Sequence, residues 1–173
     1  PTTAFDVAWR DSVSYNQFDG HYGEFSFKIA DRSSEKNYYI LNVYRLDTII
    51  EFGDTMVYFG PAYVLVQDPI LSYDINSNGV LFDDATFDGT TRTIKVQMQS
   101  EEHASASILI FGLSTVSESY FLYTKTLTAY STTGFNPFSE PVLIHSNMTP
   151  GMWIFAGYSA TFGLVPSRKF EYE

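Results

Sequence analysis

The sequence lacks cysteine altogether, which excludes disulfide bonds, thiolate chemistry and zinc sites with cysteine ligands. Basic residues are few, because ten Lys and Arg stand against twenty Asp and Glu, for a formal net charge of −10. A surface of that charge repels phosphate groups, so we expect neither nucleic-acid binding nor electrostatic docking on anionic lipid. No apolar run reaches the roughly 20 residues of a membrane-spanning helix, and we expect no transmembrane segment.

Aromatic residues are abundant, with 13 Tyr and 15 Phe in 173 residues. These residue types fit a half-buried pleated surface, so the composition favours β structure. The length suits one domain with a sizeable core, and we expect a single domain over residues 1–173. The sequence begins at Pro1, without an initiator Met or a leader pattern, and is expected to be the C-terminal part of a longer protein.

Strand patterns recur along the chain. The segments "GEFSFKIAD" (23–31) and "RTIKVQMQS" (92–100) alternate apolar and polar residues, which predicts antiparallel strands with one solvated face. Apolar runs without alternation predict central strands, and later runs predict two more, the last bent near Gly157. These further strands are expected at 37–46, 62–67, 105–114, 140–147 and 152–165. The pair Asp88-Gly89 between strand-like residues predicts a hairpin.

One segment has a helical period instead. Thr115 and Glu118 have the spacing of a capping box. Apolar residues then recur every three or four positions, at Val116, Tyr120, Tyr123, Leu127 and Tyr130. This pattern predicts an amphipathic helix over about 116–131. The expected fold class is all-β: an antiparallel β-sandwich or partly closed barrel, with that helix covering one end or face.

The stretch "DINSNGVLFDD" (74–84) begins with the spacing of a calcium-binding loop. Calcium prefers six to eight oxygen ligands, and the chain offers candidates that we name together: Asp74, Asn76, Asn78, Asp83, Asp84 and Asp88. The twelfth position of the loop is Ala85, where a bidentate Glu would belong. Asn and Asp also satisfy backbone groups in ordinary turns, and Gly79 permits a positive φ. We therefore predict a connecting loop that folds without calcium.

Other constellations for chemistry are weak. His21, His103 and His145 lie far apart with no ligand spacing, so they predict single histidines rather than a zinc site. No nucleophile elbow occurs, and the carboxylates that a glycosidase would need have turn or cap positions. Those carboxylates are Glu101, Glu102, Glu118 and Glu140. We expect no enzyme activity, no catalytic residues, no bound metal and no cofactor.

Two tryptophans, Trp9 and Trp153, could stack on sugar rings as in carbohydrate-binding sandwiches. Most large aromatic side chains are buried, so core packing is the expectation for both. Trp153 follows the turn "NMTPGM" and is the better candidate for partial exposure.

Four stretches together resemble a known family. They are "ADRSSEKNYYILNVYR" (30–45), "LFDDATFDGTT" (81–91), "SESYFLYTKTL" (117–127) and "NPFSEPVLIHSNMTPGMWIFAGYSA" (136–160). Their order and spacing are similar to the domain of unknown function 4249 group of Bacteroidota, over roughly residues 20–160. Met148 and Trp153 depart from the residues usual in that group. The second departure argues against a role that needs bare backbone at that turn.

The resemblance implies a setting rather than an activity. Members are expected to be lipoproteins of the outer membrane, the cell surface or the periplasm, anchored by an N-terminal lipid and often encoded near TonB-dependent transporters. We therefore expect a non-catalytic domain that binds a partner protein or ligand. The alternative is a carbohydrate-binding module, and a hydrolase is a more distant third.

Overall fold

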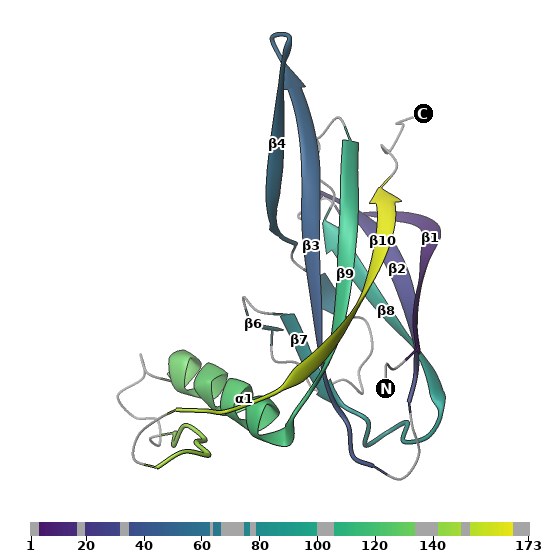
Figure 1. Cartoon of the computed structure of the whole chain (residues 1–173). Coiled ribbons are helices and arrows are strands. Elements are labelled where there is room, and N and C mark those ends of the chain that lie inside the picture. Colours follow the sequence, from purple (N-terminus) through teal and green to yellow (C-terminus); the bar gives the residue numbers. More distant parts are fainter. Residues whose placement is uncertain are drawn as a thin grey trace.

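The structure, a computed structural model, describes residues 4–16, 20–31, 35–62, 64–66, 75–76, 79–99, 106–133, 142–149 and 153–167. Within these residues, two antiparallel sheets pack face to face with one helix at an end (Figure 1). The strands are β1 (Ala4–Asn16), β2 (Gly20–Ala30), β3 (Tyr38–Glu51), β4 (Asp54–Pro61), β5 (Val64–Val66), β6 (Ile75–Asn76), β7 (Gly79–Asp83), β8 (Thr91–Gln99), β9 (Ala106–Val116) and β10 (Tyr158–Ser167). The predicted antiparallel sandwich is confirmed.

The four-stranded sheet has the order β1-β2-β8-β5. Its centre is the pair β2 and β8, whose alternation was evident in the sequence. Phe27 lies opposite Ile94, and both are buried, while the neighbouring Lys28 is exposed. Successive side chains of a strand point to opposite faces, so the apolar set of each strand meets the facing sheet and the polar set meets solvent.

The six-stranded sheet has the order β10-β9-β3-β7-β6, with β4 also paired to β3. Strand β3 is 14 residues long and changes partner along its length. Its first part, from Tyr38 to Leu41, pairs with β7, and its last part, from Tyr44 to Glu51, pairs with β4. Strand β9 pairs along the other side of β3 as far as Thr48. The β3–β4 hairpin consequently extends past the sandwich (Figure 1).

The main core lies between the sheets. It joins residues from β2, β5 and β8 to residues from β3, β7, β9 and β10. Phe25 and Phe111 meet across the layers with ring centroids 5.5 Å apart. Fully burying one such side chain contributes about 1.5–3 kcal/mol, so this layer is the main source of stability. Among the described strands no hydrogen-bonded ladder joins the two sheets, which makes the fold a sandwich rather than a barrel.

The helix α1 (Glu118–Thr133) confirms the predicted helix within two residues. Its cap differs from the prediction: Ser117 accepts from the backbone N–H of Tyr120 at 3.4 Å, whereas Thr115 is still in β9. The predicted capping box is therefore wrong. Phe121 is the buried residue of the helix, in a second cluster with Tyr38 on the outer side of the sheet.

The predicted apolar stripe is wrong in its second half. Leu127 and Tyr130 are exposed because α1 leaves the sheet after its first turns (Figure 1). No helix in the described part of the chain is long and apolar enough to cross a membrane.

Three local predictions differ from the structure. A strand was expected at 140–147 from its apolar residues, but residues 142–147 form no strand. The segment 153–157 is likewise irregular, and β10 begins only after Gly157. The turn at Asp88-Gly89 connects β7 of one sheet to β8 of the other, so it is a crossing between layers and not a hairpin. Turn chemistry is local, whereas the choice of sheet depends on distant partners.

Candidate functional site

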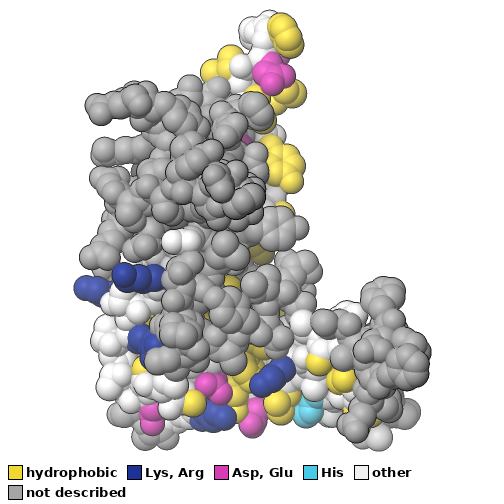
Figure 2. All heavy atoms as spheres, turned by 180° about the vertical axis from the view of Figure 1, so that it is seen from behind, with side chains coloured by type: hydrophobic (Ala, Val, Ile, Leu, Met, Phe, Trp, Pro, Cys, Tyr) yellow, Lys and Arg dark blue, Asp and Glu magenta, His cyan; other side chains and the backbone are white. Residues whose placement is uncertain are grey.

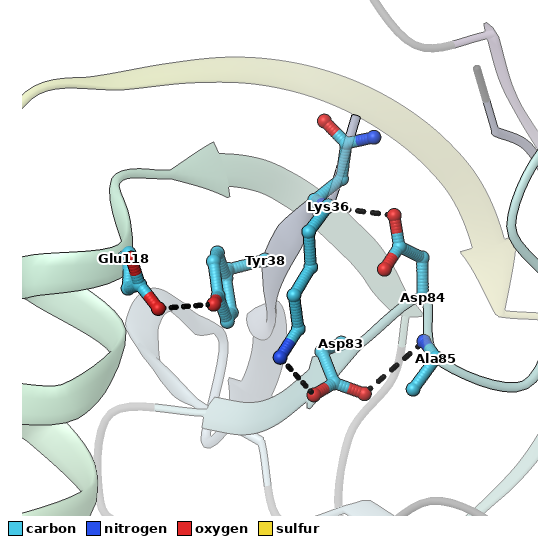
Figure 3. Close-up of polar contacts among 7 residues, drawn as sticks. Lys36, Tyr38, Asp83, Asp84, Ala85 and Glu118 are labelled. Atoms are coloured by element: carbon cyan, nitrogen blue, oxygen red, sulfur yellow. Dashed lines mark hydrogen bonds and ion pairs between the residues drawn. The ribbon is translucent and has the colours of Figure 1, made fainter. Parts of the chain in front are cut away.

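Among the described residues, a polar cluster that includes Asp31, Asp84 and Asp88 lies at the end of the sandwich from which α1 begins. We call it the acidic corner. Three segments meet there: the connection after β2, the turn 84–90 between β7 and β8, and the start of α1. Each carries one of the motifs that resemble the family. Figure 3 shows the half of this acidic corner that lies next to the helix.

Asp31 ties two of these segments together. One carboxylate oxygen accepts hydrogen bonds from the Tyr39 hydroxyl and from the Asn37 side-chain amide. The other oxygen accepts from the backbone N–H of Gly89 at 2.9 Å. Gly89 has a φ of +67°, a conformation that glycine adopts without steric cost and that turns its N–H toward the carboxylate. Asp31 therefore fixes the inter-sheet turn to the end of β2.

Asp84 is the buried acid of the corner, with 1% of its surface exposed. Its carboxylate accepts the backbone N–H of Asn37 at 2.6 Å, and its own N–H donates to the carbonyl of Asn37 at 3.2 Å. Burial raises the pKa of Asp84, the Asn37 N–H opposes that shift, and the charges of Asp31 and Asp88 add to it. The result is an acid that binds a proton more readily than an exposed Asp does.

Asp31, Asp84 and Asp88 place a carboxylate oxygen each within 4.8 Å of one another. Repulsion among them can be relieved by a proton or by a hard cation such as calcium or magnesium. However, Asp31 and Asp84 already accept hydrogen bonds from the protein, and only Asp88 is exposed. Asp31 and Asp84 therefore hold the segment after β2 and the turn 84–90 together through hydrogen bonds. We call this arrangement the latch.

Beside the latch, a second set of contacts ties β3 to α1 (Figure 3). The Tyr38 hydroxyl donates a hydrogen bond to Glu118 at 2.7 Å. Burial raises the pKa of Tyr38 most, and the hydrogen bond to Glu118 raises it further. Lys36 lies 3.8 Å from Asp83 and over the Tyr38 ring. Glu118 thus anchors the first turn of the helix to the sheet, and it is not the capping-box partner of Thr115, which lies in β9.

The other predicted candidates are not gathered here. His145 lies beside the helix, where its backbone N–H donates to the Thr126 hydroxyl at 2.9 Å. The side chain of His21 and all of His103 lie outside the described residues, as do Glu101, Glu102 and Glu140. Of the histidine and glutamate candidates, Glu118 and His145 are those whose side chains the structure describes.

The calcium-like stretch is only partly described. Asp74 and Asn78 lie outside the described residues, and of Asn76 only the backbone is described. Asn76 pairs with Gly79 in the antiparallel ladder of β6 and β7, and Gly79 has a φ of +114°. This pairing is what a connecting turn requires. The expectation that the loop folds without calcium stays a prediction.

Sequence reasoning missed the role of Asp31, although the residue stands in one of the family-like motifs. Its separation from Asp84 and Asp88 carries no ligand pattern, because Asp31 follows β2 whereas the other two acids share the turn between β7 and β8. The only sequence signal was the joint occurrence of the motifs containing them.

The expectation that Trp153 belongs to the core is wrong, because 71% of its surface is exposed. Phe155 and Tyr158 are exposed beside it in the chain. Asn147 holds this segment through its side-chain amide, which donates to the carbonyl of Phe155 and accepts its N–H. The segment therefore presents aromatic rings to solvent on a fixed backbone. The side chain of Trp9 lies outside the described residues.

A larger apolar surface lies on the six-stranded sheet, on the side away from the four-stranded sheet. We call it the outer face. Since Leu109 and Val165 point into the core, the alternate residues of β9 and β10 point outward. The exposed large apolar residues of the outer face are Ile50, Val57, Phe59, Ile108, Tyr158, Phe162 and Leu164. None of the outward residues described in β4, in β3 from 44 to 50, in β9 from 108 to 114 or in β10 from 158 to 164 is charged.

The outer face is ordered by contacts between its strands. The Phe162 ring lies on Gly112, where an added Cβ would stand 2.9 Å from the ring. Tyr44 stacks on Phe59 with ring centroids 5.5 Å apart. Antiparallel sheets with one solvated side normally alternate apolar and polar residues, and this sheet does not. An apolar face of this kind marks a surface for contact with another molecule.

Comparison with known families agrees with the motifs. A family model described as a domain of unknown function (DUF4249) matches residues 1–162. The matched region covers most of the chain and starts earlier than the resemblance noted from residue 20. No match to a curated protein was found.

Proposed function

The chain belongs to the DUF4249 family, and we propose that it is a non-catalytic domain that binds a partner protein through its outer face. In the setting that the resemblance implies, it is part of a lipid-anchored protein of the Bacteroidota outer membrane or cell surface. The expected partner in that setting is a TonB-dependent transporter.

The observation that carries the proposal is the exposed outer face, which is uncharged over β4, β10 and the adjoining parts of β3 and β9, on a chain whose net charge is −10. Keeping large apolar side chains in water opposes solubility and adds nothing to folding, and charged residues are depleted at the cores of protein interfaces. Aromatic residues are enriched there, and the outer face exposes three of them. A protein partner accounts for both features.

The test is affinity isolation of partners from outer-membrane extracts with the wild-type chain and with Phe162→Ser/Leu164→Ser. Both side chains point away from the core, so the variant should keep its fold. We expect the bound partner to be lost with the variant. Leu143→Ser is the matched control, because Leu143 is an exposed apolar residue outside the sheet. Equal recovery with all three proteins would contradict the proposal.

A carbohydrate-binding module is the second candidate, favoured by the exposed rings of Trp153, Phe155 and Tyr158. Aromatic faces of this kind stack on sugar rings. A glycan array followed by tryptophan-fluorescence titration tests this candidate. Saturable sugar binding that disappears with Trp153→Ala would favour it over the protein partner, whereas Phe162→Ser should leave such binding unchanged.

A further inference from the structure

The tip of the β3–β4 hairpin has a turn that its sequence does not favour. Phe52 and Gly53 have φ values of +52° and +90°. Positive φ at both central residues is the signature of a type I′ turn, in which Asn-Gly is preferred. Glycine suits the second position, but a phenylalanine in the left-handed region is strained. The chain accepts this strain at the tip without gaining a contact, because Phe52 is fully exposed.

The hairpin near its tip is apolar on both sides. Within the described part of β9, which starts at Ala106, Thr48 is the last residue of β3 that pairs with it, and beyond Thr48 the described ladder is that of β3 with β4. Ile50, Met56 and Val57 are exposed there. A two-stranded ribbon is marginally stable in water, and polar residues would normally solubilise it. Figure 2 shows hydrophobic and acidic side chains together at this projecting end.

The charges at the tip restrict what can bind there. Glu51 and Asp54 lie directly opposite each other in the ladder and flank Phe52. Neither carboxylate has an ion-pair partner among the residues that the structure describes. Inserting Phe52 into a bilayer would bring both carboxylates toward hydrocarbon, which is costly. Docking against a second tip would place four carboxylates together.

We propose that this hairpin tip is a docking element, in which Phe52 enters an apolar pocket of a partner protein whose rim carries Lys or Arg side chains opposite Glu51 and Asp54. Insertion would repay the strain and exposure of Phe52, and the basic rim would neutralise the paired carboxylates. Aromatic residues buried in a pocket are typical hot spots of protein interfaces. The inference rests on the proposed protein-binding function and adds a second, chemically specific contact to it.

Photo-cross-linking tests the inference. The probe is p-benzoylphenylalanine in place of Phe52 in the full chain, irradiated in membrane extracts of cells that produce the protein naturally. We expect one discrete protein adduct, whose cross-linked peptide contains apolar residues beside Lys or Arg. The same probe at the exposed Phe155, near the helix, is the matched control and should not give this adduct.

The dependence of the adduct yield on the charges of Glu51 and Asp54 distinguishes specific docking from non-specific cross-linking. In the photoreactive protein, Glu51→Lys/Asp54→Lys should lower the adduct yield by about tenfold or more, because like charges would then face each other. The neutral pair Glu51→Gln/Asp54→Asn should lower it less. Phe52→Asn suits the turn, so it should keep or raise the melting temperature, yet fail to compete with the photoreactive protein.

Several results would overturn the inference: no adduct, an adduct insensitive to charge reversal, or the same adduct from position 155. An adduct to a second copy of the chain would do so as well. Flotation with phosphatidylcholine vesicles that depends on Phe52 would assign the tip to lipid instead. If the outer-face variant loses its partner while the tip variants bind normally, the tip inference fails and the proposed function stands.

Discussion

The two ends of β3 both carry adjacent large apolar residues, but their surroundings are opposite. At the first end, Tyr39 and Leu41 face the core between the sheets, while Tyr38 and Ile40 are covered by the helix side. At the second end, Ile50 is exposed although it follows another apolar residue, Ile49. The difference lies in the neighbours: the facing sheet, β7 and α1 enclose the first end, whereas among the described residues β4 alone pairs with the second end past Thr48.

This contrast separates stability from recognition within one strand. The enclosed end is where burial and the acidic corner hold the fold, and the projecting end adds exposed apolar area without stabilising it. Apolar residues along a strand therefore predict a surface that another surface will cover. They do not indicate whether that second surface belongs to the same chain or to a partner. Substitutions at the two ends should differ accordingly.

The largest expected effect is in the enclosed end. Leu41→Ala removes a side chain with 1% of its surface exposed and should lower the free energy of unfolding by about 2–5 kcal/mol. Ile50→Ala, in the same strand, should change it by about 0.5 kcal/mol or less. Urea unfolding of both variants measures the difference. Equal destabilisation would mean that the hairpin end is covered in the folded chain.

Asp31 gives the next largest effect. Asp31→Ala leaves the Gly89 N–H and the Tyr39 hydroxyl without their acceptor, so we expect a loss of about 2–3 kcal/mol. Asp88→Ala is the matched control, because this acid is exposed and should change stability by about 0.5 kcal/mol or less. Hydrogen exchange at the Gly89 amide should accelerate only in the first variant. Unchanged exchange there would show that Asp31 is not the latch.

The sequence predicted the parts of this molecule whose patterns are local. Alternation identified β2 and β8, and the apolar run identified the enclosed part of β3. Strand β4 was missed because both of its faces are exposed, so its residues show no apolar–polar contrast. Strand β1 was missed as well, and its register shifts between Arg10 and Val13, which interrupts any period of two.

The acidic corner could not be predicted from spacing, because Asp31 comes from a different part of the chain than the turn that holds Asp84 and Asp88. Asp31 and Asp84 meet only when β2 and β7, which belong to different sheets, end at the same edge of the sandwich. The role of the Glu118 side chain was predicted wrongly for a related reason. A local cap was expected, while the side chain reaches Tyr38, 80 residues away in the chain.

A smaller effect is expected where the helix meets the sheet. Tyr38→Phe keeps the ring against Phe121 and removes only the hydroxyl that donates to Glu118. The expected loss is about 1.5 kcal/mol, the low end of the range for the net value of one hydrogen bond to a charged group. Tyr58→Phe on the exposed hairpin is the control and should melt like the wild type. If both variants melt at the same temperature, the Tyr38–Glu118 hydrogen bond does not stabilise the fold.

Asp84 should make stability depend on pH in a limited window. Its folded-state pKa is raised, chiefly by burial, so the folded chain binds the proton more tightly than the unfolded chain does. Stability from this group is therefore complete below the unfolded pKa and falls as pH rises through the folded pKa. Asp84→Asn keeps an oxygen to accept the Asn37 N–H and should flatten this fall. A steeper fall in the variant would contradict the assignment.

The smallest expected effect is that of calcium. The acids of the corner are held by protein donors, and the loop from Asp74 lacks the bidentate carboxylate that usually completes the shell. We therefore expect the same melting temperature in millimolar calcium and in chelator. A site at a hundredfold excess over its Kd would instead add about 2.7 kcal/mol, which is readily measured. If a shift occurs, Asp74→Ala and Asp88→Ala locate it: loss with the first variant would assign the ion to the loop, and loss with the second would turn the latch at the enclosed end into a cation site.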